Sequence, residues 1–335
     1  ENIGSNNYAG AYRVYDATGE EILHSNLSGT DLSETLLEES EDYFLVVSGS
    51  NASVPNTAYE LGITTPEFTT QSYTLETTVT GEISEAGEQD WYTFEGDVGQ
   101  QIFIDSVLST SREIIPRVYT PSGASFDWYD RFSRDAADIY TLEESGTYTL
   151  RIDALSSRVG EYGFRILDIS QAEELPFNAP ISGSFGESNR ETQLYQFSGD
   201  KGDRIYFQNL STGRDGSYSL YQINGERLFL NRPLDHNEDF VLPDTGDYLL
   251  AIAGNGGSNT YNMEAVKSDL LETSISLGDI ISGDITLAGQ RDTYIFDGQV
   301  GQQIFLDALG LDASLDVRLL APSGQPILSR QTHQD

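Results

Sequence analysis

The sequence predicts an all-β protein built from tandem antiparallel β-sandwich modules, jelly-roll-like and about 100 residues long, and two observations lead to this fold class. First, the stretch 81–105 recurs as 283–307, and a weaker copy covers 183–208. The glycines that open the three copies are 102 and 100 residues apart, a period typical of a small domain rather than of a solenoid turn. Second, short segments of alternating apolar residues are separated by Gly, Pro and Asp turns, without sustained helical periodicity.

Residues 79–170 are predicted to form one complete sandwich, which we call module two. A strand at 91–94 and a turn at 95–99 precede a strand at 101–105. A turn at 144–147 then leads into the last two strands. These strands alternate in period two through Tyr148, Leu150, Ile152, Tyr162, Phe164 and Ile166.

The other modules are predicted from their match to module two. Residues 179–267, module three, repeat every element. Residues 1–66, module one, carry only the late strands, and residues 279–335, module four, carry only the early ones, so both are predicted to be partial sandwiches. The connecting segments, about 64–78, 171–180 and 266–278, are short and polar and are predicted to be linkers; prolines in the second would limit its bending.

Tyrosines recur at two positions of the repeat. The first position holds Tyr92, Tyr195 and Tyr294, and the second holds Tyr43, Tyr148 and Tyr248. Because a tyrosine combines a large apolar ring with a polar tip, we predict core residues whose hydroxyl groups are hydrogen-bonded.

The charge balance excludes several classes of partner. The net charge is −36, from 54 acidic and 18 basic residues. Such a surface repels nucleic acid and anionic membranes, so we expect neither nucleic-acid binding nor membrane insertion. No apolar run is long enough for a transmembrane helix, and the absence of cysteine excludes disulfides and thiolate chemistry. The first residue is Glu rather than Met, so the chain is expected to be a processed form or a piece of a longer protein.

Module two carries the pattern of a known bacterial family. Its residues Gly81, Asp90, Tyr92, Phe94, Gly99, Ile102, Pro121, Gly123, Gly146, Tyr148, Leu150 and Ile152 resemble the pre-peptidase C-terminal (PPC) domain. Module four matches through Gly283, Asp292, Tyr294, Phe296, Gly301, Ile304, Pro322 and Gly324. Module three departs from the pattern, since Gln193 replaces the aspartate and 223–225 replaces Pro-Ser-Gly.

The resemblance implies a secreted β-sandwich that is an accessory part of peptidases or of large bacterial surface proteins. In some relatives such domains bind calcium or an insoluble polymer such as collagen. No peptidase domain accompanies the modules in this sequence, and a tandem array is typical of the surface-protein setting.

The sequence does not predict an enzyme. The histidines His24, His236 and His333 lie in different modules at non-equivalent positions, and they are expected to be loop residues. Neither a nucleophile elbow, nor a phosphate loop, nor a zinc-binding helix motif is present. The carboxylates are abundant, but nothing singles out a catalytic pair.

Asp90 and Asp292 are the acidic residues that recur at equivalent positions. One interpretation is structural: an aspartate in the turn before a strand accepts backbone N–H groups. The other is a calcium ligand that acts together with neighbouring carboxylates, because Ca²⁺ takes six to eight oxygen ligands. No cofactor other than Ca²⁺ is suggested by the sequence.

The segment 126–130 is the most unusual loop of the chain. Its aromatic residues Phe126, Trp128 and Tyr129 stand among aspartates. They could bind a sugar or a protein partner, and equally they could pack beneath the loop.

The predicted function is that of a non-enzymatic structural or interaction protein, secreted or on the cell surface, in which sandwich repeats form a rod of a bacterial surface protein, adhesin or filament. The alternative is an accessory region that holds a large secreted hydrolase on a protein or polysaccharide polymer. The complementary partial modules suggest head-to-tail self-association by strand complementation, which would build an open filament. Equally, they could be cuts through a longer array, whose neighbouring modules would then be the partners.

Overall fold

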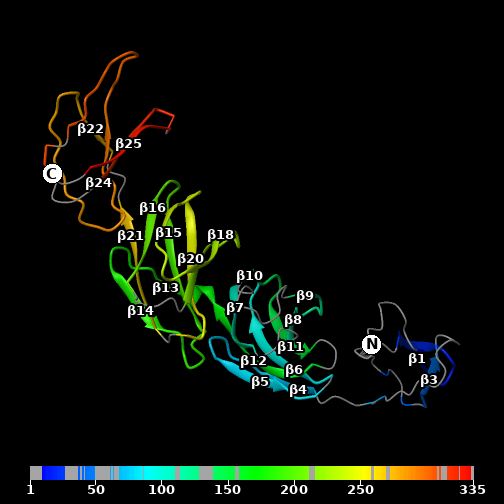
Figure 1. Ribbon diagram of the computed structural model, residues 1–335. Coiled ribbons are helices and arrows are strands. Elements are labelled where there is room, and N and C mark those ends of the chain that lie inside the picture. The colour runs from blue at the N-terminus through cyan, green and yellow to red at the C-terminus, as the bar shows by residue number, and fades with distance from the viewer. Residues whose placement is uncertain are drawn as a thin grey trace, which may run out of the picture. The chain divides into compact units, whose positions relative to one another are not determined.

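The computed structural model describes residues 10–26, 37, 40, 42–49, 61, 63, 68–85, 87–109, 114–127, 139–154, 158–210, 216–257, 260–268, 272–307, 309–310, 315–323 and 325–332 (Figure 1). The chain divides into two compact units, one of residues 1–270 with 285–291 and the other of residues 271–284 with 292–335. The regular structure consists of strands and one 3₁₀ turn, η1 (Ile169–Gln171), within these ranges. The predicted all-β fold class is confirmed.

Module two is a sandwich of two sheets. Its five-stranded front sheet has the order β4-β6-β11-β8-β9, and its four-stranded back sheet has the order β10-β7-β12-β5. The front strands are β4 (Phe68–Ser72), β6 (Gln89–Gly96), β11 (Gly146–Ala154), β8 (Ile114–Tyr119) and β9 (Ser125–Asp127). The back strands are β10 (Ile139–Thr141), β7 (Gln101–Ser109), β12 (Gly160–Asp168) and β5 (Val79–Ile83).

Module three repeats this arrangement strand for strand. The order of its front sheet is β13-β15-β20-β17-β18, and that of its back sheet is β14-β21-β16-β19. The front strands are β13 (Glu173–Glu174), β15 (Thr192–Gly199), β20 (Gly246–Gly254), β17 (Gly216–Gln222) and β18 (Arg227–Pro233). The back strands are β14 (Pro180–Ser184), β21 (Thr260–Ser268), β16 (Arg204–Asn209) and β19 (Glu238–Val241).

The segments predicted to be linkers contain strands, which corrects the sequence-based interpretation. β4 pairs in parallel with β6, and β13 pairs in parallel with β15. In the second unit, β22 (Glu272–Ser274) pairs in the same way with β23 (Thr293–Ile295). Each connecting segment therefore supplies an edge strand to the module that follows it. A short polar strand at an edge has no alternating pattern to reveal it, because neither of its faces is fully buried.

Each complete sandwich has its own apolar core between the two sheets. In module two, the residues that alternate inward from β6, β7, β11 and β12 form one buried cluster. The corresponding strands β15, β16, β20 and β21 form the other cluster in module three. Period-two alternation thus places one side chain of each neighbouring pair in the core and the other on the outer face of its sheet.

The recurring tyrosines of modules two and three lie in these cores with bonded hydroxyl groups, as predicted, whereas Tyr43 and Tyr294 are half-buried outside them. The hydroxyl groups of Tyr92 and Tyr162 are 2.7 Å apart, and those of Tyr195 and Tyr261 are 2.6 Å apart. At the second position, the Tyr148 hydroxyl donates to the carbonyl of Glu144 four residues upstream, at 2.9 Å. Tyr248 donates in the same way to Asp244.

The glycine that opens the repeat is explained by a close approach. A Cβ atom on Gly81 would overlap the hydroxyl of Tyr162, and one on Gly183 would overlap the hydroxyl of Tyr261. The repeat therefore conserves a glycine here to leave room for the buried tyrosine pair.

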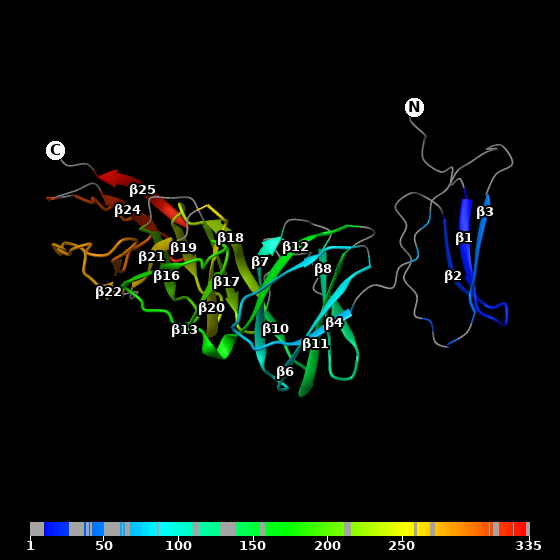
Figure 2. The ribbon, with the colours of Figure 1, turned by 90° about the horizontal axis from the view of Figure 1, so that it is seen from below.

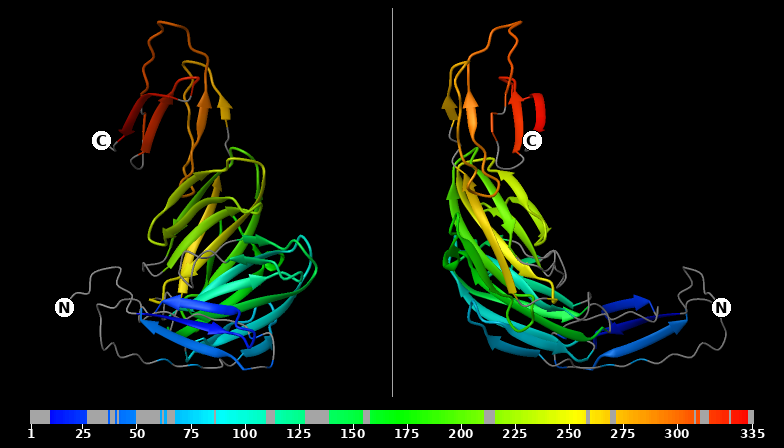
Figure 3. Two further views of the ribbon diagram at one scale, coloured as in Figure 1. Left: turned by 90° about the vertical axis from the view of Figure 1, so that its right-hand side faces the viewer. Right: turned by 60° about the vertical axis from the view of Figure 1, so that its left-hand side comes forward.

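The remaining strands belong to modules one and four. β1 (Gly10–Tyr15), β2 (Glu21–Asn26) and β3 (Phe44–Gly49) form an antiparallel sheet of order β2-β1-β3. In the second unit, β24 (Leu315–Leu320) and β25 (Pro326–Thr332) pair as the hairpin drawn in red in Figure 3. The predicted boundaries of the partial modules stay a prediction. No helix among the described residues is long and apolar enough to cross a membrane.

Candidate interaction site between two sandwiches

The back sheet of module two packs against the front sheet of module three, and Figure 2 shows β7, β10 and β12 on the side of module two that faces β17 and β20. This contact has an apolar core separate from the two sandwich cores. Module two supplies Phe103, Ile139, Leu167 and Ile169, and module three supplies Leu194, Tyr221, Leu249 and Ala251. Phe103 meets Tyr221 edge-on, with the ring centroids 6.2 Å apart. Modules two and three are therefore joined by a buried face rather than by a linker alone.

A charged cluster lies inside this contact. Asp105, Arg165 and Thr192 are 3%, 8% and 3% exposed. The Arg165 guanidinium donates to Asp105 within module two, at 2.8 Å from Nη2 and 3.2 Å from Nε. Its Nη2 also donates to the carbonyl of Thr192 across the contact, at 2.6 Å. Thr192 in turn donates to both carboxylate oxygens of Asp105, from its backbone N–H at 2.8 Å and its Oγ1 at 2.7 Å.

This cluster constrains the orientation of the two modules because Asp105 accepts hydrogen bonds from a residue of each module. A buried carboxylate needs a cation and hydrogen-bond donors, and here one donor residue belongs to the neighbouring module. Removing either module would expose Asp105 and Arg165 to water together with the apolar residues around them. The cluster therefore couples the folding of one module to the position of the next.

Further bonds surround the cluster. Gln101 Nε2 donates to the carbonyl of Ile223 at 2.5 Å. Glu191 accepts from Arg165 at 3.3 Å and from the Thr78 hydroxyl at 3.0 Å. The contact thus has an apolar centre bordered by polar pairs, which is the usual anatomy of a specific interface.

The back sheet of module three is contacted in a related way. Arg291 occupies the position in the repeat that Thr192 holds in module three. Its guanidinium donates to Asp239 at 2.9 Å, and Asp239 also accepts from the buried Arg204. The same repeat position therefore reaches the back sheet of the preceding module at both places, with a hydroxyl in one and a guanidinium in the other.

Asp90 lies in strand β6, not in the turn before it as predicted. Its carboxylate is buried, and it accepts the Tyr162 hydroxyl on one oxygen and the Thr69 hydroxyl on the other, the latter at 2.7 Å. Burial, followed by the hydrogen bond to Asp90, raises the pKa of Tyr162 well above its ordinary value. Asp90 therefore ties the edge strand β4 to the buried tyrosine pair.

Asp292 belongs to the second unit, and the structure places it beside Gly283, where a Cβ atom would lie 3.1 Å from Asp292 Oδ2. Among the residues that the structure describes, no group of three or more histidine or acidic side chains is arranged to hold a metal ion. The calcium hypothesis for Asp90 and Asp292 stays a prediction, and the hydrogen bonds of Asp90 account for its burial without an ion.

The loop residues Trp128 and Tyr129 lie outside the described residues. The backbone of Phe126 lies in the edge strand β9, paired with Val118. Asp90 and Asp292, the predicted site residues whose side chains the structure describes, are not among the residues of the contact between modules two and three.

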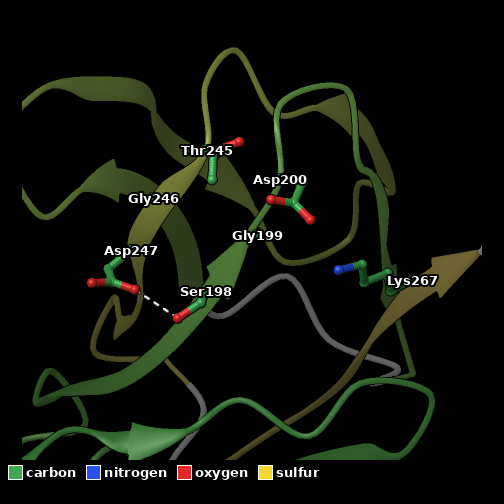
Figure 4. Close-up of a pocket in the computed structure, with 7 residues that line it drawn as sticks. All are labelled: Ser198, Gly199, Asp200, Thr245, Gly246, Asp247 and Lys267. Atoms are coloured by element: carbon green, nitrogen blue, oxygen red, sulfur yellow. Dashed lines mark hydrogen bonds between the residues drawn. The ribbon is translucent and has the colours of Figure 1, made fainter.

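A shallow polar depression of about 270 Å³ lies at one end of module three (Figure 4). It is lined by Ser198, Gly199, Asp200, Thr245, Gly246, Asp247 and Lys267. Asp247 accepts the Ser198 hydroxyl at 2.6 Å, and the Lys267 ammonium pairs with Asp203 at 2.6 Å. Burial opposes ionisation of Asp203, but the hydrogen bonds from Lys267 and from the Asp200 N–H, together with the charge of Lys267, lower the pKa of the carboxyl overall. Two of the lining side chains, Ser198 and Lys267, are thus bonded to neighbouring carboxylates.

Sequence reasoning overlooked the contact between the modules, although two signals for it are present. Residues 248–253 are an unbroken apolar run, which is typical of a strand buried on both faces. Residues 102–104 are likewise a continuous apolar run. Both runs interrupt the alternation expected of a sandwich with a solvated outer face.

No protein-family model and no curated protein matches the chain. Among solved structures it is similar to PliG of Aeromonas hydrophila, a periplasmic inhibitor of g-type lysozyme, with 15% identity, 30% of this chain and 99% of that chain covered, and a TM-score of 0.26. It is also similar to PliG of Salmonella Typhimurium, with 18% identity, 29% of this chain and 97% of that chain covered, and a TM-score of 0.23. For the CUB1-EGF-CUB2 domains of rat MASP-1, the identity is 5%, the match covers 60% of this chain and 100% of that chain, and the TM-score is 0.19. TM-scores this low assign no function to the chain.

Proposed function

We propose that this chain is a non-enzymatic structural or interaction protein that acts outside the cell, as a stack of β-sandwich repeats held face to face. The observation that carries the proposal is the buried contact between modules two and three. A chain whose modules only needed to be tethered would keep them apart with a polar linker. Here an apolar centre and a buried Asp105–Arg165–Thr192 cluster fix one module against the next.

The repetition supports a role based on length and stiffness. Repeats that contact only their neighbours extend in one direction, and each added repeat presents a new pair of faces. The strongly acidic surface suits such a protein, because like charge limits accidental aggregation in water. The resemblance to PPC domains, which occur in secreted and surface proteins, agrees with this role and with an extracellular location.

A distance measurement tests the stacked arrangement. The chain has no cysteine, so spin labels can be attached at Val98→Cys in module two and Val241→Cys in module three, both exposed positions. We expect a single narrow distance distribution by electron paramagnetic resonance. Two labels within module two, at Val98→Cys and Val159→Cys, give the width expected of one rigid body.

The outcome is judged against that control. A distribution between modules as narrow as the control supports the proposal, and Asp105→Ala should broaden it. A broad distribution in the otherwise unaltered chain would contradict a fixed stack. The proposed extracellular location is tested separately by adding protease to intact cells that express the protein. Resistance to the protease until the cells are lysed would contradict that location.

A further inference from the structure

We propose that the outer face of the front sheet of module two binds a second copy of this chain, through residues 301–307 of that copy. The inference rests on the proposed function and names the partner of a specific face. The contact between modules two and three serves as its template.

The front sheets of modules two and three have equivalent pairs of residues on their outer faces. In module three, Leu194 pairs with Ala251 and Tyr221 pairs with Leu249, and all four are buried by module two. In module two, the same positions of the same sheet are Trp91 paired with Arg151, and Tyr119 paired with Thr149. The front sheet of module two therefore presents, in the same register, the face that module three uses for docking.

This face of module two carries an aromatic pair and two arginines. The rings of Trp91 and Tyr119 are stacked, with 4° between their planes and 6.3 Å between their centroids. The Arg151 guanidinium lies 5.7 Å from the centre of the Tyr119 ring. Arg151 and Arg117 both bond to Asp153, at 2.8 Å and 3.3 Å, so two cations share one carboxylate. The face is thus aromatic and carries two of the 18 basic residues in a protein of net charge −36.

A second segment of the chain has nearly the same sequence as the segment of module two that docks on module three. Residues 301–307 read Gly-Gln-Gln-Ile-Phe-Leu-Asp, and residues 99–105 read Gly-Gln-Gln-Ile-Phe-Ile-Asp. The second sequence carries Phe103 and Asp105, the ring and the carboxylate that dock on module three. In the first sequence, Phe305 and Leu306 are 89% and 61% exposed.

Module three supports this pairing by contrast. Its own strand β16 has Tyr206 and Gln208 where modules two and four have phenylalanine and aspartate. By equivalence, Phe305 would lie on Tyr119, as Phe103 lies on Tyr221. Asp307 would then face Gln89, which takes the place of Thr192, and Arg151 stands in the place of the buried Ala251. The segment therefore offers an aromatic ring to the stacked Trp91 and Tyr119 rings, and an acidic residue to a face that carries two arginines.

The test uses the complete 335-residue chain and light scattering after size exclusion over a range of concentrations. The unaltered chain should associate as concentration rises. Phe305→Asp, which changes the binding segment, and Arg151→Glu, which changes the receiving face, should each weaken association by roughly tenfold or more. Val98→Asp changes an exposed apolar residue away from both surfaces and should associate like the unaltered chain.

A mixture of the two variants tests directly whether the segment of one copy binds the face of another. The Phe305→Asp chain keeps its receiving face and the Arg151→Glu chain keeps its binding segment, so an equimolar mixture should form dimers that neither variant forms alone. Trp91→Ser is a second receiving-face variant, and circular dichroism verifies that each variant is folded. A mixture that stays monomeric, or a Phe305→Asp chain that still polymerises, would overturn the proposal.

The two proposals fail separately. A chain that stays monomeric at all concentrations while its spin labels give a narrow distance distribution would remove the binding of a second copy and leave the stacked repeats in place. Association that is lost with Phe305→Asp but unaffected by both Arg151→Glu and Trp91→Ser would place the second copy on another face and contradict the inference.

Discussion

The two complete sandwiches differ at two equivalent positions, where module two has buried aspartates and module three has glutamines. Asp90 corresponds to Gln193, and Asp105 corresponds to Gln208. Gln193 donates to the carbonyl of Ser184 at 3.3 Å near the surface, whereas Asp90 accepts two hydroxyl groups in the interior. Because both modules have the same strand order, the fold does not require the carboxylates. Each aspartate instead serves a partner outside the common core: the edge strand β4 for Asp90 and the next module for Asp105.

The largest difference is expected between Asp105→Ala and Gln208→Ala. The first change leaves the Arg165 guanidinium buried without its main carboxylate, which should lower the free energy of unfolding by about 3 kcal/mol. The second removes a half-buried amide and should cost under about 1 kcal/mol. Differential scanning calorimetry of the two full-length variants measures both. Equal losses would show that the buried cluster does not stabilise the contact.

Asp90→Ala and Gln193→Ala should differ by less. Removal of Asp90 leaves the buried Tyr162 hydroxyl and the Thr69 hydroxyl without this acceptor, which should cost about 2 kcal/mol. Removal of Gln193 should cost about 0.5 kcal/mol or less. Urea unfolding followed by tyrosine fluorescence provides the measurement. If Ca²⁺ raised the melting temperature of the unaltered chain and not of Asp90→Ala, the calcium hypothesis would gain support over the structural role.

High pH should destabilise both sandwiches through their tyrosine pairs. Burial, followed by hydrogen bonding, raises the pKa of Tyr162 and of Tyr261. The folded state therefore keeps protons that the unfolded state releases above pH 10, so stability is fully present below that pH and falls as pH rises. For each proton that the folded state retains, the free energy of unfolding should fall by about 1.4 kcal/mol per pH unit above 10.

Absorbance at high pH tests this expectation. The buried tyrosines should ionise only as the protein unfolds, whereas all tyrosines should ionise near their ordinary pKa in guanidinium chloride. Asp90→Asn should bring the titration of Tyr162 closer to its ordinary range, because the hydrogen bond to Asp90 contributes to the raised pKa. Ionisation of every tyrosine in the folded protein would contradict the role of the pairs.

Thr69→Val should have a smaller effect than Asp90→Ala. This change deletes one hydroxyl that donates to Asp90 and keeps the shape of the side chain, so it should cost about 1 kcal/mol. Hydrogen exchange of β4 amides should accelerate more than that of the neighbouring strand β6. Unchanged exchange in β4 would show that Asp90 does not hold the edge strand.

The repeat made much of the architecture predictable. The alternation at 148–152 and 162–166 placed Tyr148, Leu150 and Ile166 in the core, where they are buried. The recurring tyrosines were predicted to have bonded hydroxyl groups because a buried phenol needs a partner. Such features depend on neighbouring residues of one strand or on one module, and each module repeats them.

What the sequence by itself determined is the modular all-β fold, since alternation and turn residues act over a few positions and recur every 102 and 100 residues. Only the tertiary structure decided which outer faces are covered and which segments complete a sheet. Asp105 and Thr192 are 87 residues apart, and nothing local in either segment specifies that they meet. Likewise β4 joins β6 through parallel pairing without an apolar pattern of its own. Contacts between modules depend on the summed shape and charge of whole faces, and these exist only once each module has folded.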